Sequence, residues 1–175
     1  MRQHYSCHME FSVRPVVAED WQSYRAIRLE MLEDTPTAYV ERLSTALEQT
    51  DNQWRERTAR GSSPTSIRCA AITTDGGWIG SMGGFIPDGH TEPILVGVYV
   101  APRWRGGAAG VTDALLHAVE TWARARSESI TLEVHEDNAR AFAAYSKRGY
   151  VVTGNTRPYE LDARSNEIEM RKMLR

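Results

Sequence analysis

The chain has 175 residues, of which 41% are hydrophobic and 25% are charged, and its net charge at pH 7 is −2. This composition is typical of one globular domain, and the charge excludes a strongly basic protein that binds nucleic acid in general. No apolar run reaches the about 18 residues that a membrane span needs, so we expect neither a membrane nor a nucleic-acid partner. We predict a single domain over residues 11–175.

Residues 1–10 lack the apolar core of a signal peptide, and we expect them to be a disordered extension. His4, Cys7 and His8 could bind a metal there, but a zinc site usually takes three or four well-placed ligands, and we predict no metal. Cys7 and Cys69 form neither a CxxC pair nor a disulfide framework. A reduced, cytoplasmic protein is therefore expected.

The first half of the chain predicts a strand, helices and a hairpin, in that order. Residues 11–16 alternate like a short strand, and residues 18–34 repeat large apolar side chains at helical spacing. Residues 39–60 are polar and helix-prone. Residues 66–73 and 78–86 are strand-like and flank a glycine-rich turn, which predicts a hairpin.

The second half begins with a continuous apolar strand over residues 94–100, which we expect to be central and covered on both faces. The remaining predicted elements are a helix from 111, a strand over 129–134, a helix over 137–148 that Asp137 caps and Gly149 ends, and strands that begin at 150 and 167. This order predicts an α+β fold around one mixed sheet.

The stretch RWRGGAAG, residues 103–110, joins the apolar strand to the next helix through five residues with almost no side chain. A helix start offers unpaired N–H groups and a partial positive charge, and small residues let a ligand approach them closely. The stretch lacks the lysine of the ATP-binding phosphate loop and the glycine spacing of the dinucleotide fingerprint. It indicates either another kind of anion site or a tight connection that binds nothing.

Two motifs in this region resemble those of the GNAT (GCN5-related N-acetyltransferase) family. Arg103, Gly106 and Ala108 resemble its signature Gln/Arg-x-x-Gly-x-Gly/Ala, with alanine where glycine is commoner. The second motif, Asn-x-x-Ala-x-x-x-Tyr-x-x-x-Gly-aromatic, is matched by Asn138, Ala141, Tyr145, Gly149 and Tyr150. The order of elements is also similar over nearly the whole chain. The resemblance implies an acyl-CoA N-acyltransferase fold, with a mixed, mostly antiparallel sheet flanked by helices, and one N-acetyltransferase domain.

The resemblance also implies that acetyl-CoA is the acetyl donor. Its pantetheine arm would lie along the strand residues Val98, Tyr99 and Val100, as an added strand would. Asn138 would orient this arm, unless its amide is used locally at the helix start. The pyrophosphate would be held by the N–H groups of Arg105, Gly106, Gly107, Ala108, Ala109 and Gly110. The side chains of Arg103 and Arg105 either add positive charge there or stay solvated.

Acetyl transfer to an amine needs a donor for the oxyanion and a proton for the departing thiolate. In the family's pattern Tyr145 is the acid near the sulfur, and the alternative is that its ring only packs against the sheet. A backbone N–H of the central strand, that of Val98 or Tyr99, would serve the oxyanion. The sequence contains no evident nucleophile–base pair, so we expect direct transfer without an acyl-enzyme.

The amine must also lose a proton, since an alkyl ammonium has a pKa of about 10. Glu92 stands where some members of the family carry a catalytic glutamate, unless it is a solvated loop residue. Glu133 is a weaker candidate, and a chain of waters is a further route. We expect the isolated histidines, His90, His117 and His135, to be surface or capping residues.

The acceptor is predicted to be the primary amine of a small molecule or peptide, and its identity stays open. By resemblance, residues 21–60, with Tyr39, Glu41 and Trp54, and the loop 87–93 shape its site. A scatter of acidic residues could attract a cationic amine or be ordinary surface; these are Asp34, Glu41, Glu48 and Asp51. A non-catalytic acyl-CoA-binding or sensing module is the alternative function, and a homodimer is possible because such folds often pair through sheet edges.

Overall fold

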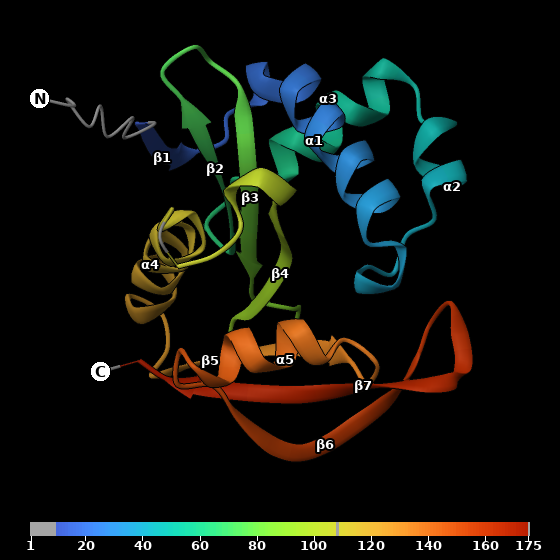
Figure 1. Ribbon diagram of the computed structural model, residues 1–175, viewed down its shortest axis with the longest axis vertical. Helices are drawn as coiled ribbons and strands as arrows, with labels where there is room; N and C mark the ends of the chain where they lie inside the picture. The colour runs from blue at the N-terminus through green and yellow to red at the C-terminus, as the bar shows by residue number, and fades with distance from the viewer. Residues whose placement is uncertain (1–9, 108, 175) are drawn as a thin grey trace, which may run out of the picture.

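Seven strands form one mixed sheet in the part of the chain that the structure, a computed structural model, describes: residues 10–107 and 109–174. The strands lie in the order β1-β2-β3-β4-β5-β7-β6, and all neighbours are antiparallel except β4 and β5. Helices flank this sheet (Figure 1). The predicted α+β class with a mixed, mostly antiparallel sheet is confirmed.

The bounds of the elements follow the predicted order. The strands are β1 (Phe11–Pro15), β2 (Ser66–Thr73), β3 (Trp78–Phe85), β4 (Ile94–Val100), β5 (Ser129–His135), β6 (Val151–Tyr159) and β7 (Asp162–Met173). The α-helices are α1 (Trp21–Asp34), α2 (Leu43–Leu47), α3 (Asp51–Arg60), α4 (Val111–Arg124) and α5 (Ala139–Ser146). Short 3-10 turns, η1 (Ala18–Asp20), η2 (Pro36–Ala38) and η3 (Pro102–Trp104), connect some of them.

Two helix boundaries differ from the prediction because of capping side chains. The helix-prone stretch 39–60 divides into separate helices because Thr50 starts α3. Its hydroxyl accepts the N–H of Gln53 at 3.3 Å, and the Gln53 amide oxygen accepts the N–H of Thr50 at 2.7 Å. At α5 the cap is Asn138 and not Asp137, because the Asn138 amide oxygen accepts a first-turn N–H at 3.1 Å.

The central strand β4 is covered on both faces, as its apolar sequence predicts. Tyr99 packs into a core formed with α1 and α3, which includes Tyr24 and Trp54. Its neighbour Val100 points to the other face and packs into a second core with α4, which includes Leu115. The two cores fix β4 between α1 and α4, so the edge of β4 and the turn after it are held in place.

β4 and β5 pair only where they begin and then diverge. Ile94 lies opposite Thr131, whose N–H donates to the carbonyl of Pro93 at 3.0 Å. Beyond this pair, no described strand joins β4 on that edge. Gly97, with a φ of +59°, lies at a register shift between β3 and β4, where only glycine adopts the backbone without strain. The divergence opens a gap that α5, which follows β5, lines from the other side.

Some predicted features fall on residues 1–9 and Ala108, which lie outside the described residues. These include nearly all of the proposed extension, with His4, Cys7 and His8. In the described ranges, no helix is long and apolar enough to cross a membrane, and no group of three or more His, Cys, Asp or Glu side chains is arranged to hold a metal.

Candidate active site

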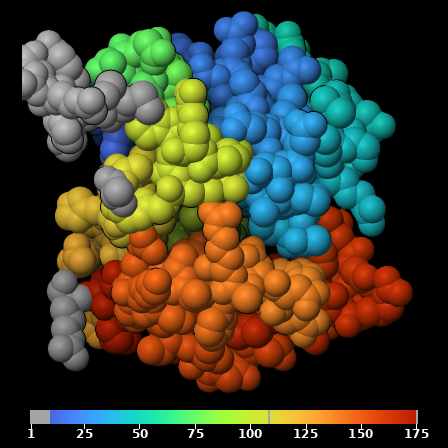
Figure 2. Space-filling view, viewed as in Figure 1, coloured from blue at the N-terminus to red at the C-terminus, as the bar shows by residue number. Residues whose placement is uncertain are grey.

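Two hollows meet beside β4. The outer groove, about 540 Å³, lies between β4, the turn at residues 105–107 and α5. In Figure 2 the surface is hollowed between the yellow-green segment that follows β4 and the orange α5. The inner cavity, about 250 Å³, lies deeper between α1, α3, β4 and β5. Six residues line both hollows and so mark the junction: Ala38, Tyr39, Val98, Asn138, Ala141 and Tyr145.

The free edge of β4 forms one wall of the outer groove. Backbone groups of alternate residues point to opposite edges of a strand. The carbonyl of Val98 accepts the hydroxyl of Tyr39 at 2.9 Å, and that of Val100 accepts Nε of Arg105 at 2.7 Å. Val98, Tyr99 and Val100, the three residues predicted to bind the pantetheine arm, all line the groove.

The small-residue turn forms the mouth of the groove and leads into α4. Arg105, Gly106 and Gly107 line it, whereas Arg103, Ala109 and Gly110 do not. Gly106 and Gly110 have φ values of +105° and +70°, and an added Cβ would meet only open space at both positions.

Gly110 is the N-cap of α4 and provides no side-chain cap for the first-turn N–H groups. The turn therefore offers the free donors and the room that an anion requires. Of the predicted turn residues, Ala108 lies outside the described part of the chain.

Positive side chains around the groove come from both of its walls. Arg105 is held in place: besides its bond to β4 it forms an ion pair with Asp34 of α1. Three further cations line the groove and were not predicted from the sequence: Arg140 on α5, and Lys147 and Arg148 directly after it. Arg148 pairs with Asp113 at 2.7 Å. Their spacing was the available sequence signal, because positions i, i+7 and i+8 of the helix predicted over residues 137–148 share one face.

Tyr145 and Asn138 project from α5 to the junction. The ring of Tyr145 packs edge-on against Tyr150, with centroids 5.6 Å apart, so the packing role considered for it is also present. Burial, with the nearby Tyr39, raises the pKa of the Tyr145 hydroxyl, which keeps it protonated. The amide oxygen of Asn138 accepts the capping hydrogen bond of α5, and the residue also lines both hollows.

Glu92 is not brought to the junction. It precedes β4, on the closed side of the Ile94–Thr131 pair, and lines neither the outer groove nor the inner cavity. Its carboxylate accepts two bonds from Arg171, at 2.8 and 2.9 Å, and one from Ser129 at 2.5 Å. The carboxylate is occupied by these partners, and the geometry gives no support to a role as general base.

Glu133 lines the inner cavity instead, together with Glu167 of the neighbouring β7. Arg157 contacts both carboxylates, at 2.6 and 3.0 Å. Burial raises the pKa of Glu133, and the charges of Glu167, Glu169 and Glu160 add to this, against the lowering effect of Arg157. A carboxyl group with a raised pKa in a cavity is a candidate proton acceptor.

His135 makes a capping contact, as one of its two predicted roles has it, but it is not a surface residue. It is 8% exposed, lines the inner cavity and packs edge-on against Tyr159. Its Nδ1 accepts the N–H of Asp137 at 3.2 Å, which is a local capping contact. His90 and His117 are exposed, as expected.

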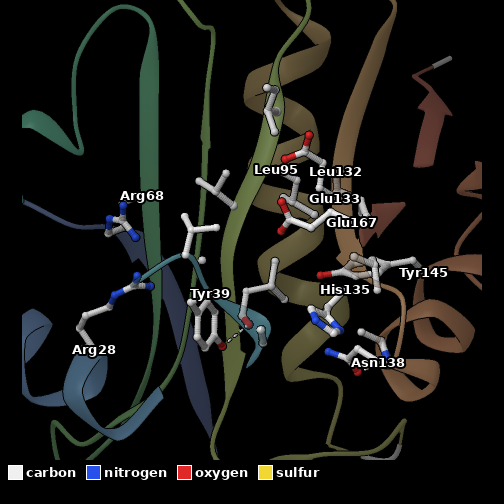
Figure 3. Close-up of a pocket in the computed structure, with 18 of the residues that line it drawn as sticks. Arg28, Tyr39, Arg68, Leu95, Leu132, Glu133, His135, Asn138, Tyr145 and Glu167 are labelled. Atoms are coloured by element: carbon white, nitrogen blue, oxygen red, sulfur yellow. Dashed lines mark hydrogen bonds between the residues drawn. The ribbon is translucent and has the colours of Figure 1, made fainter. Parts of the chain in front are cut away.

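The opposite wall of the inner cavity carries arginines. Arg28, Arg57 and Arg68, from α1, α3 and β2, line it with Tyr24. Arg28 and Arg68 are labelled in Figure 3. Of the residues proposed for the acceptor site, Tyr39 lines the cavity, Glu41 pairs with two of these arginines, and Trp54 is fully buried in the core. The loop 87–93 lines neither hollow.

Comparison with known proteins supports this reading of the fold. No curated protein sequence matches the chain significantly. Among solved structures, a GNAT acetyltransferase from Streptococcus pneumoniae is 18% identical, with a TM-score of 0.77 over 95% of this chain and 100% of that one. YncA from Salmonella typhimurium, solved with its cofactor acetyl-CoA, is 14% identical, with a TM-score of 0.75 over 95% of each chain.

A third structure, the PaiA N-acetyltransferase from Thermoplasma acidophilum in complex with coenzyme A, is 19% identical. Its TM-score is 0.72 over 94% of this chain and 99% of that one. The model of the acetyltransferase (GNAT) family matches residues 25–150, which is most of the chain and includes both motifs. This chain therefore belongs to the GNAT family of acetyltransferases.

Proposed function

We propose that the chain is an N-acetyltransferase that moves the acetyl group of acetyl-CoA directly to a primary amine. The observation that carries this proposal is the meeting of the outer groove and the inner cavity at Tyr145. Two hollows that share one wall of side chains allow a donor and an acceptor to enter separately and to react at the junction. This arrangement brings the reacting groups together without a covalent enzyme intermediate.

The outer groove fits acetyl-CoA on three counts. The turn and the start of α4 offer N–H groups to a pyrophosphate, the free edge of β4 offers backbone groups to an extended arm, and Lys147 and Arg140 add positive charge. Two related structures of this fold were solved with coenzyme A or acetyl-CoA. The bound thioester would supply the activated acetyl group.

Glu133 in the inner cavity and Tyr145 at the junction divide the two proton transfers between them. Glu133, with its raised pKa, accepts the proton of the amine, directly or through water. The backbone N–H of Val98 donates to the acetyl oxygen as it gains charge, whereas Tyr99, which lies opposite Ser81, directs its N–H toward β3. Tyr145, kept protonated by burial, supplies a proton to the thiolate that leaves. Glu133 replaces Glu92 in this scheme because it lines the cavity and Glu92 does not.

The Tyr145→Phe variant tests the scheme. We expect turnover, measured as release of the CoA thiol with a panel of amines, to fall by about 100-fold. The acetyl-CoA dissociation constant, measured by calorimetry, should change less than about threefold, because Phe keeps the ring contact with Tyr150. Unchanged turnover would remove Tyr145 as the acid. Acetyl-CoA binding without acetylation of any amine would favour a non-catalytic acyl-CoA-binding module.

A further inference from the structure

The inner cavity has two walls of opposite charge, and this polarity specifies the acceptor. We propose that the acceptor is a free amino acid, whose amine faces Glu133 and whose carboxylate is held by Arg68 with Arg28 beside it. This inference rests on the proposed N-acetyltransferase function and names its acceptor class. In Figure 3, Arg28 and Arg68 lie on one side of Tyr39, and Glu133 and Glu167 lie on the other.

The arginine wall has more positive charge than its own carboxylate can balance. Glu41 accepts bonds from Arg28 at 2.7 and 2.9 Å and from Arg57 at 2.6 and 2.7 Å. Arg68 forms no ion pair or hydrogen bond with any described residue, and its Nε is buried without a partner. Its guanidinium stacks on the ring of Tyr24, 4.6 Å from the centroid. Three guanidinium groups thus share one carboxylate, and Arg68 is the one left unpaired.

The pKa of Tyr24 reflects the positive charge of this wall. Burial alone raises the pKa of a phenol. At Tyr24 the charges of Arg68, Arg57 and Arg28 outweigh burial, and its pKa is lowered. The pKa of Arg68 is also lowered, by its burial and by repulsion from Arg28 and Arg57. A buried, uncompensated charge is costly unless an opposite charge joins it, so an anionic ligand is the missing partner.

The unpaired guanidinium points to the place where acetyl transfer would occur. A Cβ added at Gly97 would lie 3.3 Å from Nη1 of Arg68 and 3.9 Å from Nη1 of Arg28. Both guanidinium groups therefore converge on the bulge of β4, one residue before Val98 at the junction. Nη1 of Arg28 is free of Glu41, which contacts its Nε and Nη2. An anion at this point has an Nη1 donor from each of two arginines, and such charge-assisted hydrogen bonds suit a carboxylate.

The facing wall suits an ammonium group. Glu133 and Glu167 share the guanidinium of Arg157, which is 46% exposed, so two carboxylates face the cavity with one partly solvated cation between them. The cavity of about 250 Å³ is smaller than the roughly 300–1,000 Å³ of drug-sized sites, which favours a small acceptor. A polyamine carries several cations and no anion, so it would place positive charge against Arg68.

The test compares amino acids with their carboxamides, which keep the amine and lose the negative charge. The kcat/KM values come from release of the CoA thiol, with the protein amino acids, their amides and spermidine as probes. We expect the best amino acid to be at least about 100-fold better than its amide. In Arg68→Gln, kcat/KM for this amino acid should fall by about 100-fold, and kcat/KM for its amide should fall less than threefold. Arg164→Gln, an exposed surface arginine, should behave as wild type.

Folding of the variant is checked separately. Arg68 has no hydrogen bond or ion pair to lose, and removing its buried charge offsets the loss of its stacking on Tyr24, so Arg68→Gln should melt at the same temperature as wild type or higher. An amide or spermidine that reacts as well as the best amino acid would overturn the inference and leave the N-acetyltransferase function intact. An equal fall in kcat/KM for the amino acid and for its amide in Arg68→Gln would also overturn the inference.

If no amine is acetylated, the proposed function fails, and calorimetry with the same probes decides the anion site. Binding of an amino acid that needs its carboxylate and is lost in Arg68→Gln would support the site. If the amino acid and its amide bind equally, or if neither binds, the anion site is overturned.

Discussion

Replacing Arg157 by glutamine tests whether Glu133 is the general base, because the two groups are coupled. Their N and O atoms are 2.6 Å apart, and the charge of Arg157 lowers the pKa of Glu133 against burial. Without that charge, burial and the like charges of Glu167, Glu169 and Glu160 act alone and raise the pKa of Glu133 further. A protonated carboxyl cannot accept the amine proton, so activity should fall at a higher pH than in wild type.

The size of the shift follows from the ion pair. Unit charges about 4 Å apart attract by about 1 kcal/mol in water and about 4 kcal/mol at an effective permittivity of about 20. Because the Arg157 side chain is 46% exposed, solvent screening places the attraction near the lower end. About 1 kcal/mol corresponds to roughly 0.7 pKa units. We therefore expect the acid limb of kcat/KM to move up by about one pH unit.

The assay is the pH dependence of kcat/KM for CoA release over about pH 5–9. Glu133→Gln should lower kcat by at least about 100-fold and abolish the acid limb. Glu128→Gln, at an exposed position, is the matched control and should leave both unchanged. An acid limb that stays in place in Arg157→Gln, or one that survives in Glu133→Gln, would refute the assignment of Glu133.

Two further predictions concern the turn and the arginine wall. Gly106→Glu should weaken acetyl-CoA binding by more than about 100-fold in calorimetry. Gly89→Glu, at a position that also has a positive φ (+76°) and open space for a side chain, should not; equal affinities would refute the pyrophosphate site. Glu41→Gln should lower stability by about 3 kcal/mol, or the melting temperature by about 6–12 °C, because Arg28 and Arg57 lose their carboxylate. These partners lower the pKa of Glu41 to about 2, so the difference from wild type should be full above about pH 4.5 and shrink as the pH falls through 2; a difference that grows at low pH would contradict the pairing.

The elements that form the outer groove could be predicted from local sequence. The apolar run at 94–100, the small residues after it and the tyrosine on α5 each carry their signal within a few residues. Local signals also placed the helix start at 137–138 to within one residue, where two side chains with similar capping ability stand next to each other.

The inner cavity could not be predicted in the same way. Arg68 and Glu133 come from strands β2 and β5, and only the splay of β4 from β5 places them on facing walls. The choice between Glu92 and Glu133 depends on where the single β4–β5 pair lies, because Glu92 falls on its closed side. Such long-range register has no signature in one sequence.

The most direct measurement is a calorimetric titration of the purified wild-type protein with acetyl-CoA. We predict one binding site per chain with a micromolar dissociation constant, since the uncapped start of α4, the free edge of β4 and the cations on and just after α5 converge on the outer groove. No binding at millimolar acetyl-CoA would contradict it, and would leave the small-residue turn as a tight connection between β4 and α4.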